Sequence, residues 1–219
     1  MKARETFDAQ LKELKDELLM LGKMAEDALD DAIQALKEQD VEKALRIIDS
    51  DYKINDLEEE INDKSIWMIA KEQPVAIDLR RLITALKIST DVERVGDLAV
   101  NIAKSVIRIG DEPLIKPLED IPKRASIAQK MINDVLQAYF DEDVAKAKAI
   151  ADVDDEVDQL YGKLIKELLA MMTKRPESIA QITQLSFVCR HIERVADHAT
   201  NISENIIYLV KGKRYDLNS

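Results

Sequence analysis

The sequence contains few of the residues that interrupt helices, cross-link chains or act as nucleophiles. Among its 219 residues are five glycines, five prolines, one cysteine and only 4% aromatic residues. A single cysteine excludes an internal disulfide, and we interpret Cys189, which lies in an apolar helical stretch, as a core residue rather than a nucleophile. Ala, Leu, Ile, Glu, Lys and Asp dominate instead, as is typical of long helices. The composition therefore predicts an all-α protein.

Long apolar runs are also missing. No window approaches the roughly 20 apolar residues of a membrane-spanning helix, and residues 1–8 have no apolar signal-peptide core. We therefore predict a cytoplasmic protein with no transmembrane segment. The formal charge of −11 disfavours nucleic-acid binding, because phosphate backbones are bound by clustered Lys and Arg. We expect no direct nucleic-acid partner.

The sparse helix breakers divide the chain into six long helices. Pro74, the prolines of residues 113–122 and Pro176 are the main interruptions, joined by Gly110 and polar turns near residues 40 and 142. We predict helices over about 5–38, 41–72, 75–109, 120–140, 143–173 and 177–211. Residues 110–117, with Gly at a helix end and two prolines beyond it, are the expected linker. The predicted domains are residues 1–111 and 112–219.

The two predicted domains share a repeated sequence. Residues 93–103 match residues 193–203 at seven of the eleven positions. The apolar residues around them also match at an offset of 100, so that each half contributes one equivalent helical seam: Ile88, Val92, Val95, Ala99 and Ile102 in the first half, Val188, Ile192, Val195, Ala199 and Ile202 in the second. An internal duplication is indicated. We expect two pseudo-symmetric three-helix bundles.

The repeat carries an acidic pair in each half, Glu93 with Asp97 and Glu193 with Asp197. At about 100° per residue, both carboxylates of a pair lie opposite the apolar seam. One interpretation is a solvated helix face. The other is a binding site for a hard cation, because carboxylates one turn apart repel each other unless a positive charge lies near. Leu79, Leu82 and Leu86 lie upstream on the same side and predict a second packing surface that ends in an acidic patch.

Catalytic signatures are largely missing. The sequence has no Glu-x-x-His for a di-iron centre, no glycine-rich phosphate loop and no His-Glu-x-x-His zinc pair. His191 and His198 have no defined partner, so a nucleophile and base cannot be paired. Trp67 is interpreted as a core or dimer contact. We predict that the protein is not an enzyme.

The acidic motifs and their surroundings resemble the PhoU family. Asp78, Arg80 and Arg81 lead into Glu93 and Asp97 as in the family's first signature, and residues 191–202 resemble its second copy. The resemblance covers nearly the whole chain. It implies two three-helix bundles and a negative regulator of phosphate uptake and of the phosphate-starvation response. It also implies two partners, the ATPase subunit of a phosphate ABC transporter and a sensor histidine kinase.

The resemblance further implies metal binding by Glu/Asp-x-x-x-Asp motifs. These fall on Glu93, Asp97, Glu193 and Asp197, with Asp154 and Asp158 as a third pair. The implied cofactors are metal ions in multinuclear clusters, of iron, zinc, manganese or magnesium. In the first half Asp51 is followed by Asn55 instead of a second acid, so the two halves are not equivalent.

Our leading hypothesis is an adaptor protein that forms a homodimer. A helical scaffold without metal and a carboxylate–metal enzyme are the alternatives. Arg80 and Arg81 have no counterparts at Ala180 and Gln181, so their contacts are expected to belong to one half alone.

Overall fold

The computed structural model describes residues 2–116 and 118–217, and the side chains of residues 2, 3, 155, 156, 158 and 160 lie outside that description. Within these limits the chain is all-α and has no strand. The first half contains α1 (Lys2–Glu38), α2 (Val41–Ser50), α3 (Tyr52–Glu72) and α4 (Ala76–Ile109). The second contains α5 (Asp120–Asp141), α6 (Val144–Ala151), α7 (Asp154–Lys174), the short 3-10 helix η1 (Pro176–Ser178) and α8 (Ile179–Lys211). The all-α prediction and the duplication are confirmed.

Two of the predicted helices contain a break that the sequence reading did not include. The helix expected over 41–72 divides at Asp51 into α2 and α3, and the one expected over 143–173 divides at residues 152–153 into α6 and α7. Asp51 keeps right-handed helical angles, so this break bends the helix without a loop. Beside the break, the Ser50 hydroxyl donates to the Ile47 carbonyl at 3.2 Å.

Each bent helix pair begins with the same aspartate cap. The Asp40 carboxylate accepts the backbone N–H of Lys43 at 2.8 Å, and Asp143 accepts those of Ala145 and Lys146. Such caps satisfy N–H groups that have no partner within the helix. The preceding residues, Gln39 and Glu142, both have positive φ. The two halves therefore repeat their turns as well as their helices.

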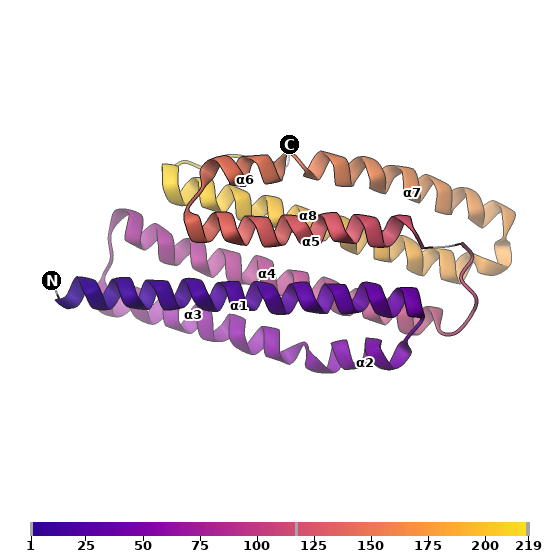
Figure 1. The fold of residues 1–219 in the computed structure, drawn as a ribbon, viewed down its shortest axis with the longest axis horizontal. Coiled ribbons are helices and arrows are strands. Elements are labelled where there is room, and N and C mark those ends of the chain that lie inside the picture. The colour runs from indigo at the N-terminus through magenta and orange to yellow at the C-terminus, as the bar shows by residue number, and fades with distance from the viewer. Residues whose placement is uncertain (1, 117, 218–219) are drawn as a thin grey trace.

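The halves join through their longest helices. In Figure 1, α4 and α8 lie side by side and antiparallel at the centre, and α1 lies antiparallel to α5. The predicted seams of α4 and α8 are fully buried, which confirms both of them. Gly22 of α1 permits the second contact, since a Cβ there would lie 2.0 Å from the Leu136 side chain of α5. The molecule is thus an elongated bundle with one continuous core.

The segment between α4 and α5 is held by both halves. Gln39 of the first half donates to the carbonyls of Gly110 and Glu112 at 3.0 and 2.7 Å. Gln181 of α8 is buried and accepts the N–H of Ile115 at 2.7 Å. None of the described helices is apolar over enough of its length to cross a membrane. The division at residues 111 and 112 stays a prediction.

Candidate functional site

The acidic pair of the first half belongs to a larger group of carboxylates. Asp51, at the bend between α2 and α3, and Glu58 of α3 lie close enough to the pair on α4 for their charges to interact. We call Asp51, Glu58, Glu93 and Asp97 the first acidic cluster. Sequence periodicity identified the two α4 residues only. Asp51 and Glu58 were not identified because the bend at Asp51 was not predicted, and this bend directs the start of α3 along the acidic face of α4.

The first acidic cluster carries more negative charge than its surroundings neutralise. Burial and the charge of Asp97 raise the pKa of Glu93, and Glu58 and Asp51 add to the effect although Arg94 opposes it. Burial and Asp97 also raise the pKa of Asp51. Burial and like charges both disfavour the ionised carboxylate. A positive charge among these residues would therefore be stabilised.

Glycine at position 96 permits the close approach of α4 to the bend. A Cβ on Gly96 would lie 3.0 Å from the Ile54 Cδ1 atom and 3.6 Å from Asp51 Oδ1. The equivalent residue of the second half is Ala196, which is fully buried. The second half therefore accommodates a side chain at this position, whereas in the first half the bend between α2 and α3 lies against Gly96.

Each acidic pair has an arginine partner, but the arginines occupy different positions. Arg94 contacts Asp97 at 2.7 Å and Glu93 at 3.4 Å. In the second half Arg190, one turn before Glu193, contacts it at 2.9 Å. In the first half Thr90 stands at the place of Arg190 and donates its hydroxyl proton to Glu58 at 3.0 Å.

The predicted site residues of the second half are only partly described. Glu193 of α8 is 9% exposed, so it is not a solvated side chain, and Asp197 is half-buried one turn further on. Asp154 is the first residue of α7. The side chain of Asp158 lies outside the described residues. The metal assignment of all six predicted residues stays a prediction.

The chemistry of the first acidic cluster fits a hard cation, although its geometry is not that of a finished site. Its ligand atoms are all carboxylate oxygens, which suit cations such as Mg²⁺ or Mn²⁺. Among the side chains that the structure describes, however, no three His, Cys, Asp or Glu residues converge closely enough to hold one ion. Ion binding would therefore require these carboxylates to turn towards one another.

The remaining candidate residues have defined roles. Cys189 is fully buried, and burial raises its thiol pKa to about 11, so it is a core residue as predicted. Burial, with Arg194 and Arg190 nearby, lowers the pKa of His191 to about 4. His198 has a partner that the sequence did not reveal, since its Nδ1 atom lies 2.9 Å from Asp91 Oδ1 across the α4–α8 contact. Trp67 is 48% exposed, which excludes the core interpretation.

The family model for the PhoU domain matches residues 18–106 and again residues 121–206. The chain belongs to the PhoU family. The two matched segments are the two halves of the structure, so the PhoU domain occurs twice in this chain, as the internal repeat predicted.

Named relatives match over almost the whole length. A phosphate-specific transport system accessory protein PhoU homolog of Clostridium acetobutylicum is 42% identical, with 98% of this chain and 99% of the relative covered. The homolog of Rhizobium meliloti is 38% identical, with 94% and 87% covered. The crystal structure of the phosphate transport system regulatory protein PhoU from Streptococcus pneumoniae superposes with a TM-score of 0.90 at 33% identity, over 96% of this chain and 99% of that one. PhoU from Pseudomonas aeruginosa also gives a TM-score of 0.90 at 33% identity, over 94% and 100%.

Within this PhoU fold, Arg80 and Arg81 contact the opposite half. The Arg80 guanidinium donates to the Leu209 carbonyl in the last turn of α8 at 2.9 Å, where a cation is favoured by the helix dipole. Arg81 binds Glu142, at the turn between α5 and α6, through two bonds of 2.9 and 3.1 Å. Ala180 and Gln181, at the matching positions of the second half, carry no guanidinium that could form the equivalent contacts.

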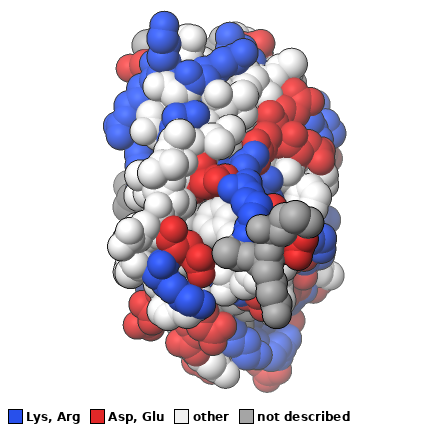
Figure 2. All heavy atoms as spheres, turned by 90° about the vertical axis from the view of Figure 1, so that its left-hand side faces the viewer, with Lys and Arg blue, Asp and Glu red and all other residues white. Residues whose placement is uncertain are grey.

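Arg81 is the centre of an ion-pair network at one end of the molecule. It also contacts Asp78 at 3.0 Å, Asp78 is bound by Arg4, and Lys15 contacts Glu142 at 3.0 Å. Basic and acidic side chains accordingly lie interleaved over this end of the bundle in Figure 2. These ion pairs join α1 and α4 to the α5–α6 turn.

Proposed function

We propose that this chain regulates phosphate transport as an accessory to a phosphate-specific transporter, and that it keeps the phosphate-starvation response switched off while phosphate is plentiful. The observation that carries the proposal is its likeness to PhoU accessory proteins along the whole chain, at 42% identity to the relative from Clostridium acetobutylicum and with a TM-score of 0.90 to two solved PhoU structures. Both halves and the acidic motifs are included in this match.

The mechanism that we infer is protein–protein coupling without turnover. The chain would act in the cytoplasm and connect the ATPase subunit of the transporter to a sensor histidine kinase. The bundle offers long, partly acidic helix surfaces for such contacts. We include homodimer formation in the proposal, because Ile66 and Trp67 of α3 are apolar yet 56% and 48% exposed.

The first acidic cluster and the acidic residues Asp154, Glu193 and Asp197 of the second half would be the regulated part of these surfaces. Asp51, Glu93 and Asp97 would hold a cation in the first half, and Asp154, Glu193 and Asp197 in the second. When bound, a hard metal ion supplies positive charge that neutralises the carboxylates. The raised pKa of Glu93 is consistent with this role, because it comes first from burial and then from the charges of Asp97, Glu58 and Asp51, and a cation would oppose both effects.

A scaffold without metal is the second candidate. It is favoured by the arginine partners, since Arg94 and Arg190 already place a guanidinium within 3 Å of a carboxylate in each pair. A carboxylate–metal enzyme is the weakest alternative, because the PhoU relatives that the chain matches are named as accessory or regulatory proteins.

The proposal is tested by deleting the gene and measuring phosphate-repressible alkaline phosphatase in phosphate-rich medium. We expect the phosphatase to be expressed constitutively and wild-type chain to restore repression. Complementation with the double variant Glu93→Ala plus Asp97→Ala then distinguishes between two hypotheses, the adaptor that binds metal and the scaffold without metal. The matched control is Glu59→Ala plus Asp63→Ala, an exposed acidic pair of the same spacing on α3.

Repression lost with the first pair and kept with the control supports the acidic cluster as the regulated surface. Repression restored by both variants supports the scaffold. Continued repression in the deletion strain would contradict the regulatory function itself.

A further inference from the structure

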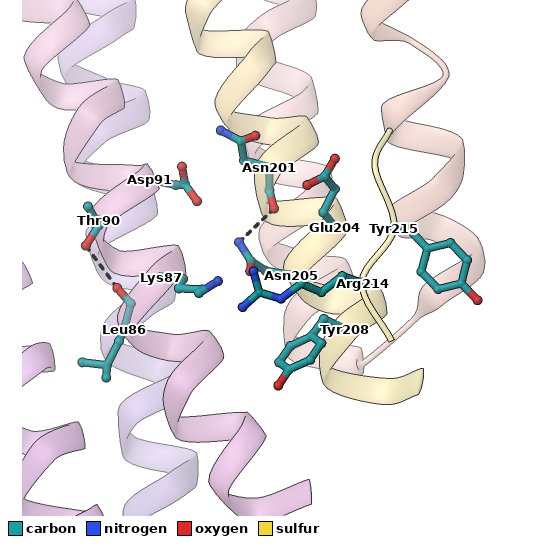
Figure 3. A pocket seen from close by; sticks show the side chains of 10 residues that line it. All are labelled: Leu86, Lys87, Thr90, Asp91, Asn201, Glu204, Asn205, Tyr208, Arg214 and Tyr215. Carbon is teal, nitrogen blue, oxygen red and sulfur yellow. Dashed lines mark hydrogen bonds between the residues drawn. The ribbon is translucent and has the colours of Figure 1, made fainter. Parts of the chain in front are cut away.

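A polar pocket of about 440 Å³ lies between α4, α8 and the C-terminal segment that follows α8. It is separate from the residues of both acidic pairs. Lys87 extends into it from α4, Asn201 and Asn205 line it from α8, and Arg214 reaches it from the C-terminal segment (Figure 3). The pocket is not duplicated, because Phe187 stands in the second half where Lys87 stands in the first. The matching region of the second half therefore lacks the lysine that lines this pocket.

The C-terminal segment, residues 212–217, is fastened in the position that forms this pocket. Gly212 ends α8 with a φ of +68°, a conformation that glycine adopts without strain. The segment then turns back along the helix, and the N–H of Leu217 donates to Glu204 Oε1 at 2.7 Å. Arg214 lies over the Tyr208 ring at 5.5 Å. These contacts hold the Arg214 guanidinium at the mouth of the pocket.

The two carboxylates of the pocket already have partners. Asp91 binds the ring of His198 at 2.9 Å, and Glu204 accepts the N–H of Leu217. Figure 3 shows Glu204 on the side of the C-terminal segment, away from Lys87. Neither acid is therefore placed to neutralise the basic side chains of the pocket.

The two cations lack such partners. In the part of the chain that the structure describes, neither Lys87 nor Arg214 forms an ion pair with a carboxylate. In Figure 3 both side chains point towards the space between α4 and α8, with the Asn205 amide close to them. Two like charges that face one space are stabilised by an anion between them. An ammonium, a planar guanidinium and side-chain amides are also the donors that proteins use for phosphate oxygens.

We propose that this pocket binds a phosphate group, with Lys87 and Arg214 as its principal ligands and the second N–H of the Asn205 amide as a further donor, since the first donates to the Asn201 carbonyl at 3.0 Å. The volume of about 440 Å³ lies within the range of small-molecule sites, so that a phosphate ester of a small molecule has room as well as the free ion. Because Arg214 belongs to the C-terminal segment, occupancy of the pocket also holds that segment against α4.

This inference goes beyond the proposed function and is tested apart from it, with purified full-length protein. Isothermal titration calorimetry is run with inorganic phosphate and, in a second arm, with AMP as a phosphate ester. Both titrations are repeated with a chelator, which removes any contribution from phosphate coordinated to a bound metal. The variants are Lys87→Gln and Arg214→Gln. The control is Lys213→Gln, which removes the same charge from the same segment but does not line the pocket.

We expect the wild-type chain to bind at least one of the two probes with and without chelator. Lys87→Gln and Arg214→Gln should each weaken that binding by about tenfold or more, because each removes a charged donor, whereas Lys213→Gln should change it less than twofold. Tighter binding of inorganic phosphate identifies the free ion as the ligand, and tighter binding of AMP identifies a phosphate ester. No binding of either probe, or equal losses in all three variants, would overturn the proposal. Circular dichroism melting of each variant confirms that the comparison is made between folded proteins.

Discussion

At the scale of single residues, Glu93 shows how a partly buried carboxylate can oppose folding. Its ionised form is disfavoured by burial and by the nearby carboxylates, which raise its pKa above the ordinary value of 4.5. A carboxyl group whose pKa rises on folding stabilises the fold only while it is protonated. That stabilisation is present below about pH 4.5 and is lost as the pH rises through the raised value. At neutral pH Glu93 therefore opposes folding.

We predict that Glu93→Gln raises the melting temperature of metal-free protein at pH 7 and has no such effect at pH 4. Glutamine keeps the shape of the side chain and removes the charge. A gain of about 1 kcal/mol corresponds to about 2–4 °C for a chain of this size. The lost ion pair with Arg94 offsets little of this gain, because Arg94 is exposed. Differential scanning calorimetry in the presence of a chelator measures the change.

The same variant should bind less metal, as measured by elemental analysis after dialysis against Mn²⁺. Glu59→Gln on the exposed face of α3 is the matched control and should change neither quantity. A Glu93→Gln protein that melts below the wild type at pH 7 would show that the carboxylate is stabilising, contrary to this account.

At the scale of secondary-structure elements, Arg81 fastens α4 to the turn between α5 and α6. Bonds from Arg81 and Lys15 lower the pKa of Glu142 despite its burial, and the bond from Arg4, with Arg81, lowers that of Asp78. Carboxylates with lowered pKa values stabilise the fold above their ordinary values of 4.5 and 3.8. This contribution is lost as the pH falls through the lowered values.

We predict that Arg81→Gln lowers the free energy of unfolding by about 1–3 kcal/mol at pH 7, since it leaves partly buried charges without their partner. The difference from the wild type should shrink as the pH falls below the ordinary values of 4.5 and 3.8 and through the lowered values of Glu142 and Asp78. Urea denaturation at several pH values gives the free energies. Arg108→Gln, an exposed arginine in the last turn of the same helix, should change them by less than about 0.5 kcal/mol. An equal loss in both variants would rule out the network as the cause.

The elements also show which parts of the structure are readable from sequence. The α4 and α8 seams were predictable because buried positions of one helix recur at helical spacing, and Asp40 and Asp143 mark their turns locally. The break at Asp51 was not, since Asp occurs within helices and on bends alike. Glu58 could not be assigned to the first acidic cluster, because its approach to Glu93 depends on how α3 docks on α4. The same holds for the contact between His198 and Asp91.

At the scale of the whole molecule, the two halves bury each other's apolar surface. α4 lies against α8 and α1 against α5, so that residues 1–111 alone would expose the faces of α1 and α4 that the second half covers. Exposed apolar surface of that kind drives association.

We predict that residues 1–111 and 112–219, expressed together as separate polypeptides with a tag on one, purify as a complex. The tagged first half expressed by itself should self-associate, because α4 would then meet a second α4 in place of the matching α8. Affinity purification followed by light scattering distinguishes the two cases. Two stable monomers that do not copurify would show that the halves are independent domains.

The contacts of the segment between α4 and α5 restrict how the two halves can move relative to each other. Gln39 binds it from the first half, Gln181 binds it from the second, and Lys116 contacts Glu167 of α7 at 2.8 Å. Contacts at residues 110, 112, 115 and 116 restrain this connection against hinge motion. We therefore expect the two halves to move as one rigid body, so that a partner that displaces one end of the bundle also displaces the other end. The states of such a protein would differ in which of its surfaces are bound by partners, and not in the angle between its two halves.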